Sequence, residues 1–119
     1  MRLRLIHFAK RGDVASLEDQ IRSSSVPVLV EFVERGSAPC RSETRVLEQL
    51  VGDYAGRLTV IQTDVDGALD DAERYRIVAL PTLVLFNEAR EIARLTGFKP
   101  LVEVRAALDT ALATLDSAE

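Results

Sequence analysis

The sequence predicts an α/β domain in which helices cover both faces of a mixed central sheet of about five strands. Segments with strand character and segments with helical spacing alternate along the chain in the order β-α-β-α-β-α-β-β-α. The early strand segments are separated by helical ones, as in parallel crossovers. The last two are joined only by residues 87–90, a connection typical of an antiparallel hairpin. A sheet with both parallel and antiparallel pairs follows.

Each expected element has a local signal in the sequence. The expected strands are residues 3–8, 28–33, 58–63, 83–86 and 92–96, and the expected helices are residues 13–22, 38–54, 68–75 and 100–115. Arg2 and Arg4 alternate with apolar neighbours, which suits an edge strand. Asp13 is placed to cap the first helix. Residues 28–33 are apolar on both faces apart from Glu31, which is typical of a central, covered strand.

The later elements follow from similar signals. Gly56 suits a left-handed stop at the end of the long helix. Residues 58–63 are rich in β-branched side chains, which favour strands. Pro100 suits the first position of the last helix, whose apolar side chains recur at helical spacing.

Composition and charge exclude several classes of protein. A chain of 119 residues suits one domain, residues 1–119, and its net charge of -4 gives no general attraction to nucleic acid. No apolar run approaches the roughly 20 residues of a membrane helix. The N-terminus lacks the apolar stretch and cleavage site of a signal peptide. We therefore expect a cytoplasmic monomer that binds neither nucleic acid nor membrane.

Two features that resemble metal ligands have simpler interpretations. Residues 64–71 hold four carboxylates, but their offsets do not match the calcium loop of an EF-hand. A strand end followed by a short helix with acids in its first turn accounts for them. His7 is the only histidine, so we interpret it as structural. We expect no metal and no cofactor.

The most informative stretch is Gly36-Ser37-Ala38-Pro39-Cys40, where a strand runs into a loop that opens a helix. The first turn of a helix has unpaired N–H groups and the positive end of the helix dipole. A thiol at its entrance is pushed toward thiolate, and in a Cys-x-x-Cys motif this position holds the attacking sulfur. Here it holds Ser37. Only the second position, Cys40, carries sulfur, and one cysteine cannot form an internal disulfide.

These residues resemble the thioredoxin family along about residues 3–115. Residues 36–40 match the family signature Trp-Cys-Gly-Pro-Cys, and residues 30–32 match its Val-Asp-Phe strand. Residues 54–60 match its Tyr-Ala-Gly-Lys-Leu-Thr-Val stretch, residues 80–82 its Ile-Pro-Thr motif, and Gly97 its late glycine. The resemblance implies the thioredoxin fold.

The resemblance also implies a role for each matched position. Ser37 stands at the nucleophile position, Cys40 at the resolving thiol, Glu31 at the buried carboxyl and Pro81 at a cis proline. The residues implied to contact an extended peptide are Gly36, Ala38, Pro39, Leu80, Thr96, Gly97 and Phe98. The sequence departs from the family pattern at several of these positions. Besides the serine, Glu31 replaces the family's aspartate, and Gln62 replaces the lysine that usually pairs with that aspartate. Val33 and Gly36 replace the tryptophans that flank the site.

Glu31 and Cys40 each keep two interpretations. Glu31 is either buried, where burial raises a carboxyl pKa unless a charge compensates, or it reaches water at the strand end. Cys40 is either a small buried hydrophobe or a single thiol able to form one mixed disulfide.

The missing sulfur decides the functional interpretation. Disulfide exchange needs a thiolate attacker and a second thiol, and the hydroxyl of Ser37 cannot replace the attacker. We interpret the chain as a thioredoxin-like protein with a Ser-x-x-Cys motif, inactive as a dithiol reductase, that binds polypeptide clients or thiol proteins. It is similar in this to the thioredoxin domain of some chaperedoxins, which hold unfolding clients. The alternative is a thiol–disulfide oxidoreductase whose nucleophilic cysteine has been replaced by Ser37, and a third interpretation is a structural subunit.

Overall fold

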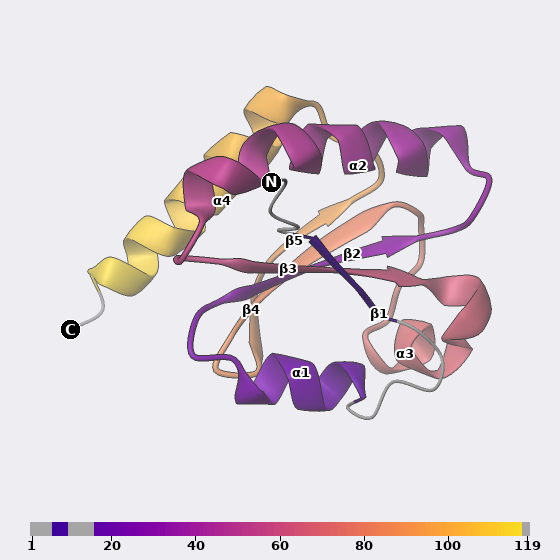
Figure 1. Cartoon of the computed structure of the whole chain (residues 1–119), viewed down its shortest axis with the longest axis horizontal. Coiled ribbons are helices and arrows are strands. Elements are labelled where there is room, and N and C mark those ends of the chain that lie inside the picture. Colours follow the sequence, from indigo (N-terminus) through magenta and orange to yellow (C-terminus); the bar gives the residue numbers. More distant parts are fainter. Residues whose placement is uncertain (1–5, 10–15, 118–119) are drawn as a thin grey trace, which may run out of the picture.

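The elements of the computed structural model, which describes residues 6–9 and 16–117, follow the predicted order (Figure 1). The strands are β1 (Ile6–Ala9), β2 (Val28–Val33), β3 (Thr59–Asp64), β4 (Thr82–Asn87) and β5 (Arg90–Thr96). The helices are α1 (Leu17–Ser23), α2 (Ala38–Leu50), α3 (Leu69–Arg74) and α4 (Leu101–Asp116), with 3₁₀ turns η1 (Val51–Tyr54) and η2 (Val65–Gly67).

The strands form one mixed sheet in the order β1-β3-β2-β4-β5. Strand β3 pairs in parallel with β1 and β2, whereas β4 is antiparallel to β2 and β5 is antiparallel to β4. The predicted mixed sheet and its late hairpin are therefore confirmed. Strand β2, predicted to be central, lies in the middle of the sheet, and all six of its residues are buried.

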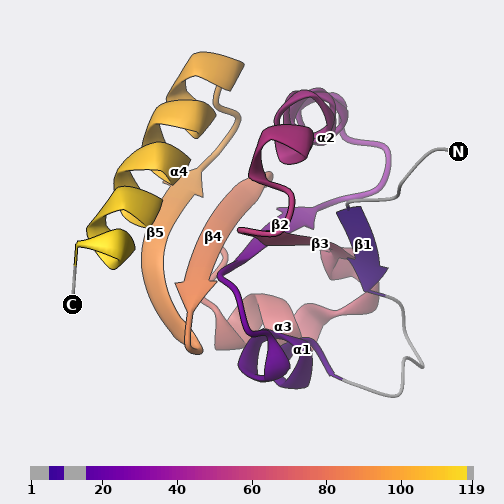
Figure 2. The same ribbon diagram turned by 60° about the vertical axis from the view of Figure 1, so that its left-hand side comes forward.

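Two layers of helices enclose the sheet. Helices α2 and α4 cover one face, and α1 and α3 cover the other (Figures 1 and 2). Successive side chains of a strand point to opposite faces, so each strand contributes to two cores. Leu29 of β2 and Leu85 of β4 pack on the α2–α4 side with Leu47. Val30 and Val84, their neighbours in sequence, pack on the opposite side.

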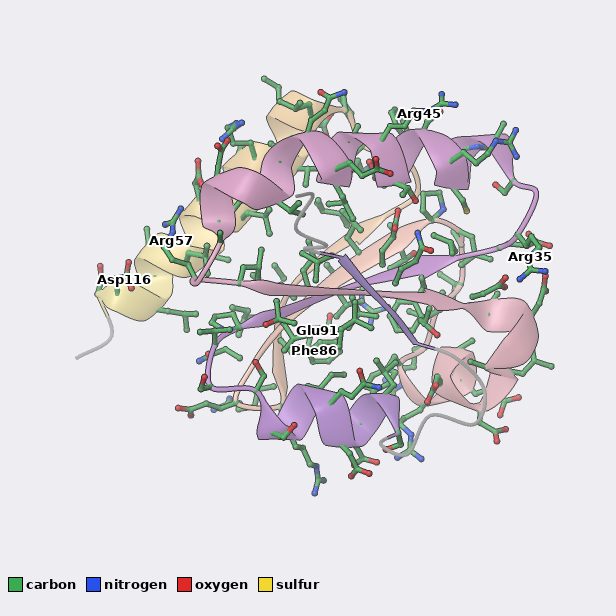
Figure 3. All side chains as sticks on the ribbon, in the orientation of Figure 1. Arg35, Arg45, Arg57, Phe86, Glu91 and Asp116 are labelled. Atoms are coloured by element: carbon green, nitrogen blue, oxygen red, sulfur yellow. The ribbon has the colours of Figure 1, made fainter. Side chains whose placement is uncertain are left out.

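Helix α2 carries the long amphipathic segment that the sequence predicts, but it ends earlier than expected. On its inner face, Leu47 and Leu50 are fully buried, while Arg45 lies on its outer side (Figure 3). The α-helix ends at Leu50, and the last predicted turn is the tighter η1. Such 3₁₀ turns are common at helix ends. Gly56 has a φ of 81°, as its predicted role as a stop requires.

The N-terminal boundaries differ from the prediction. Helix α1 begins at Leu17, and its N-cap is Ser16, whose Oγ accepts a hydrogen bond from the Asp19 N–H at 3.0 Å. The predicted cap Asp13 and residues 3–5 of the predicted first strand lie outside the described residues. His7 lies on β1, but its side chain is outside the described part as well.

The acidic stretch after β3 forms a turn and a short helix, as predicted. Asp64 Oδ1 accepts a hydrogen bond from the Asp66 N–H at 3.0 Å and so caps η2. Among the described residues, no group of three His, Cys, Asp or Glu side chains is arranged to hold a metal ion. Within the same residues, no helix combines the length and apolar character that crossing a membrane requires. The cytoplasmic location stays a prediction.

Candidate functional site

The loop between β2 and α2 is held by Ser37. Its Oγ accepts a hydrogen bond from the Cys40 N–H at 3.3 Å, and its carbonyl accepts one from the Arg41 N–H at 3.0 Å. Ser37 is thus the N-cap of α2, and Pro39 stands in the first turn, where its missing N–H costs nothing. Gly36 has a φ of 86°, a conformation that glycine adopts without strain. The hydroxyl at the nucleophile position therefore serves as a helix cap.

Cys40 lies beneath this loop. Its side chain is 3% exposed, and its Sγ accepts a hydrogen bond from the Glu34 N–H at 3.4 Å. The first interpretation of Cys40, a small buried side chain, describes this arrangement. A reagent can reach the sulfur only if the loop moves.

Glu31 lies at the centre of a buried polar network. It is fully buried and shares the α2-facing side of β2 with Leu29, two residues earlier. Gln62 is its neighbour in the parallel register of β3, and Gln62 Nε2 donates to Glu31 Oε1 at 2.9 Å. Thr44 Oγ1, on α2, lies 3.0 and 3.1 Å from the two carboxylate oxygens and 3.1 Å from the Cys40 carbonyl oxygen. Gln62 also donates to Thr44 Oγ1 at 3.0 Å.

The network raises the pKa of Glu31. Burial lifts it from its ordinary value of 4.5 to about 7, because only neutral hydrogen bonds from Gln62 and Thr44 compensate for lost hydration. The nearby charges of Glu43 and Glu48 raise it further. Of the two sequence interpretations, the structure shows the buried carboxyl. Gln62 stands where the resemblance placed a lysine partner, and no cation among the described residues offsets the burial.

A second buried carboxyl, Glu43, was missed from the sequence. Its Oε1 accepts a hydrogen bond from the Lys99 N–H at 2.9 Å, and its Oε2 is buried with no partner among the described residues. Burial raises the pKa of Glu43 above its ordinary value, against the hydrogen bond and charge of Lys99. The signal was present: Cys40, Glu43 and Leu47 follow the helical spacing of the buried face of α2.

The segment around Pro81 lies against the end of β5. The Leu80–Pro81 peptide bond is cis, and the Gly97 N–H donates to the Pro81 carbonyl at 2.8 Å. Thr82 Oγ1 closes the turn before β4 by donating to the Ala79 carbonyl at 2.6 Å. The predicted positions Leu80, Pro81 and Gly97 are therefore brought together.

Three apolar residues flank this contact, and we call them the apolar rim. Val78 is 85% exposed and Phe98 is 44% exposed, whereas Leu80 is half-buried against the core on the α1–α3 side. Thr96 is exposed. Val78 was not among the predicted site residues, although it lies two positions before Leu80 in an apolar run.

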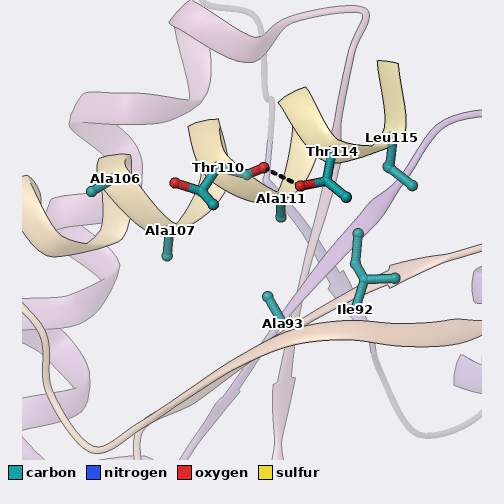
Figure 4. Close-up of a pocket in the computed structure, with 8 residues that line it drawn as sticks. All are labelled: Ile92, Ala93, Ala106, Ala107, Thr110, Ala111, Thr114 and Leu115. Carbon is teal, nitrogen blue, oxygen red and sulfur yellow. Dashed lines mark hydrogen bonds between the residues drawn. The ribbon is translucent and has the colours of Figure 1, made fainter. Parts of the chain in front are cut away.

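A hollow of about 310 Å³ lies between Glu34, just before the Ser37 loop, and two residues of the apolar rim, Val78 and Leu80. It is lined by Glu34, Val65, Ala72, Ile77, Val78, Ala79 and Leu80. Glu34 belongs to the loop that leads to Ser37, so two segments distant in sequence share one surface. A larger groove of about 490 Å³ lies elsewhere, between α4 and β5, and is lined mainly by alanine and threonine (Figure 4). No predicted site residue lines that groove.

Comparison with known proteins places the chain in a family. The model of the family described as Thioredoxin matches residues 10–110. The chain belongs to the thioredoxin family. Thioredoxin of Mycobacterium bovis is 36% identical over 85 residues, which cover 71% of this chain and 73% of that protein. Thioredoxin of Staphylococcus epidermidis is 33% identical over 81 residues, 68% of this chain and 78% of the relative. Thioredoxin C-2 of Corynebacterium nephridii is 31% identical over 94 residues, which cover 79% of this chain and 87% of that protein.

Membership of the thioredoxin family confirms the fold expected from the sequence. The chain keeps the strand–loop–helix unit, but the whole sequence contains one thiol, that of Cys40, and it is buried. A two-thiol exchange cycle needs a second sulfur within reach. The site as built offers a capped helix, a neutral or singly charged buried carboxyl and an exposed apolar rim.

Proposed function

We propose that this thioredoxin-family chain binds extended or unfolding polypeptide segments and does not act as a dithiol reductase. The observation that carries the proposal is the contrast between the two halves of the site. Cys40 is 3% exposed, whereas Val78 and Phe98 of the apolar rim are 85% and 44% exposed. A surface of this kind suits recognition by contact rather than by bond exchange.

The backbone next to the apolar rim supports an extended bound segment. Leu80 lies outside helices and strands, and in the described part of the chain its N–H and C=O have no hydrogen-bond partner. An extended peptide can pair with such a backbone as an added strand, with its apolar side chains on the rim. The predicted contact residues Gly36, Ala38 and Pro39 lie in the loop and first turn that follow Glu34, a lining residue of the hollow, but none of the three lines it. The Ser-x-x-Cys motif is also similar to that of some chaperedoxins, which hold unfolding clients.

The proposed binding is tested by suppression of aggregation. The wild-type chain should slow the aggregation of a heat-denatured client protein at near-equimolar concentration. Val78→Glu and Phe98→Glu should each weaken this effect, because a charge on the apolar rim must be desolvated when the client binds. Thr110→Glu, in the separate groove between α4 and β5, is the matched control and should behave as wild type. Equal protection by all four proteins, or none by the wild type, would refute the proposal.

The second candidate is a disulfide oxidoreductase whose attacking sulfur was replaced by Ser37. The names of the relatives and the buried carboxyl of Glu31 favour it. Ser37→Cys separates the two, because it restores a thiol at the N-cap of α2, where thiolate is stabilised. We expect this variant to remain a poor reductase of a protein disulfide. Turnover at a rate typical of thioredoxins would favour the enzyme.

A further inference from the structure

We propose that Arg94 is a positioning residue that holds the Ile77–Leu80 segment beside Phe98, so that the apolar rim is formed before a peptide arrives. This inference rests on the proposed function. Arg94 lies on β5 and was not a candidate site residue. Its guanidinium reaches from the strand to the chain just after α3, on the path that leads to Leu80.

The contacts of Arg94 are specific. Nη2 donates to the Tyr75 carbonyl at 2.7 Å, and Nη1 donates to the Arg76 carbonyl at 3.1 Å. Nε and Nη2 also donate to the two carboxylate oxygens of Glu91, at 2.9 and 2.7 Å. The planar fork of arginine fits such paired acceptors, whereas a lysine ammonium is a single point charge. The Arg94 side chain is only 25% exposed.

A β-bulge makes this geometry possible. In a regular strand, residues three apart point to opposite faces. The register of β4 and β5 shifts between Leu85 and Phe86, so that Ile92 is an extra residue between the pairs Leu85–Ala93 and Phe86–Glu91. Glu91 and Arg94 therefore share one face of the sheet, the α1–α3 face. Glu91 orients the guanidinium, and the two backbone carbonyls lie within its reach.

The carbonyls that Arg94 binds lie where the backbone leaves α3 in an unfavourable conformation. Helix α3 ends at Arg74, and the last carbonyls of a helix have no intrahelical partner. Arg76 then adopts a φ of 55°, which is unfavourable for a residue with a Cβ. The chain turns there into Ile77 and the apolar rim. Hydrogen bonds from Arg94 favour this turn over alternatives with Arg76 in a relaxed conformation.

Both ends of the segment that carries Val78 and Leu80 are thus tied to β5 or to the residue that directly follows it. Arg94 holds its start at Tyr75 and Arg76, and Gly97 holds its end through the Pro81 carbonyl. Since Phe98 follows Gly97 directly, the two sides of the apolar rim are fixed to one strand. Without Arg94, only the anchor at Gly97, directly after β5, remains of these two. A smaller share of molecules would then present a formed rim, and apparent affinity falls in proportion to that share.

The test measures affinity and local opening in the full-length chain. The probe is reduced, carboxymethylated lactalbumin, which cannot refold. Arg94→Ala should bind it about five- to tenfold more weakly than wild type, with faster hydrogen exchange confined to the amides of Arg76 and Ile77, the two in this segment that donate hydrogen bonds among the described residues. Arg94→Lys should fall between the two. Arg105→Ala, which removes another arginine ion pair, 3.0 Å from Asp53 on the opposite side of the sheet, is the control and should match wild type.

The outcomes separate the inference from the proposed function. If the wild-type chain does not bind the probe, the proposed function is refuted, and the positioning role fails with it. If the wild type binds and Arg94→Ala binds equally well, the role of Arg94 alone is refuted, whatever its stability. Weaker binding by Arg94→Ala with hydrogen exchange unchanged at Arg76 and Ile77 would also contradict positioning, because it would indicate a direct contact.

Discussion

Replacing Glu31 by glutamine isolates the electrostatic cost of the buried network. Glutamine keeps the shape of the carboxyl and satisfies the same partners. Its carbonyl oxygen accepts from Gln62 Nε2, and its amide donates to Thr44 Oγ1, whose own proton turns to the Cys40 carbonyl 3.1 Å away. The variant therefore imitates the protonated form of Glu31 and cannot ionise.

The sign of the effect follows from the raised pKa. The pKa of Glu31 is about 7 in the folded chain and 4.5 for an ordinary glutamate, so the folded state holds a proton that the unfolded state has already lost. Stability contributed by this group is complete below pH 4.5 and is lost as the pH rises to about 7. Each tenfold change in dissociation constant is worth about 1.4 kcal/mol, so the interval of 2.5 between the two values amounts to about 3 kcal/mol.

The assay is urea unfolding of wild type and Glu31→Gln, from about pH 4.5 to about pH 8. The chain contains no tryptophan, so circular dichroism follows the transition. As the pH rises across this range, the free energy of unfolding of the variant minus that of wild type should increase by about 3 kcal/mol. Nearly all of this increase should occur below about pH 7.5. Glu43 is present in both chains and cancels to first order. A difference between the two proteins that does not change with pH would refute the reasoning.

Three further substitutions test local features by the same unfolding assay. Ser37→Ala removes the N-cap hydrogen bond to the Cys40 N–H and should cost about 1 kcal/mol, whereas Ser37→Asp should retain most of the stability. Tyr54→Phe removes the 2.6 Å hydrogen bond to exposed Asp109, and we expect a loss of about 1–2 kcal/mol; no loss would mean that water replaces the contact. Ala89→Gly relieves a φ of 66° in the tight β4–β5 turn and should stabilise the chain by about 0.5–1 kcal/mol; destabilisation would contradict the strain.

The fold was largely predictable because its signals are local and repeated. Alternating runs gave the order of the elements, and the short connection before β5 gave the hairpin. The boundaries were less accurate where several residues compete for one role. Ser16 caps α1 although the sequence also offers Asp13 as a cap. The β5 strand begins at Arg90 rather than at residue 92, because the turn needs only two residues, Glu88 and Ala89, both with positive φ.

The site was predictable at the positions that the family resemblance matched, but not in its supporting contacts. Gln62 and Glu31 are 31 positions apart, and Arg94 is 19 positions from Tyr75. Contacts over such separations leave no periodic pattern, since only the tertiary fold brings the residues together. Arg94 also depends on a bulge that shifts side chains by one face. Glu43 is different: its helical spacing marked it as buried, and only the expectation that glutamates are exposed hid it.

The buried network shows why single departures from a family pattern are poorly interpreted one at a time. A lysine at position 62 would favour the ionised form of a buried carboxyl. Gln62 offers hydrogen bonds but no charge, so both protonation states of Glu31 find partners. The ionised form accepts from Gln62 and Thr44. The neutral form donates to Thr44, which then donates to the Cys40 carbonyl in the first turn of α2. Glu31, Thr44 and Gln62 therefore form one unit, and loss of the cation is matched by a carboxyl that titrates near pH 7.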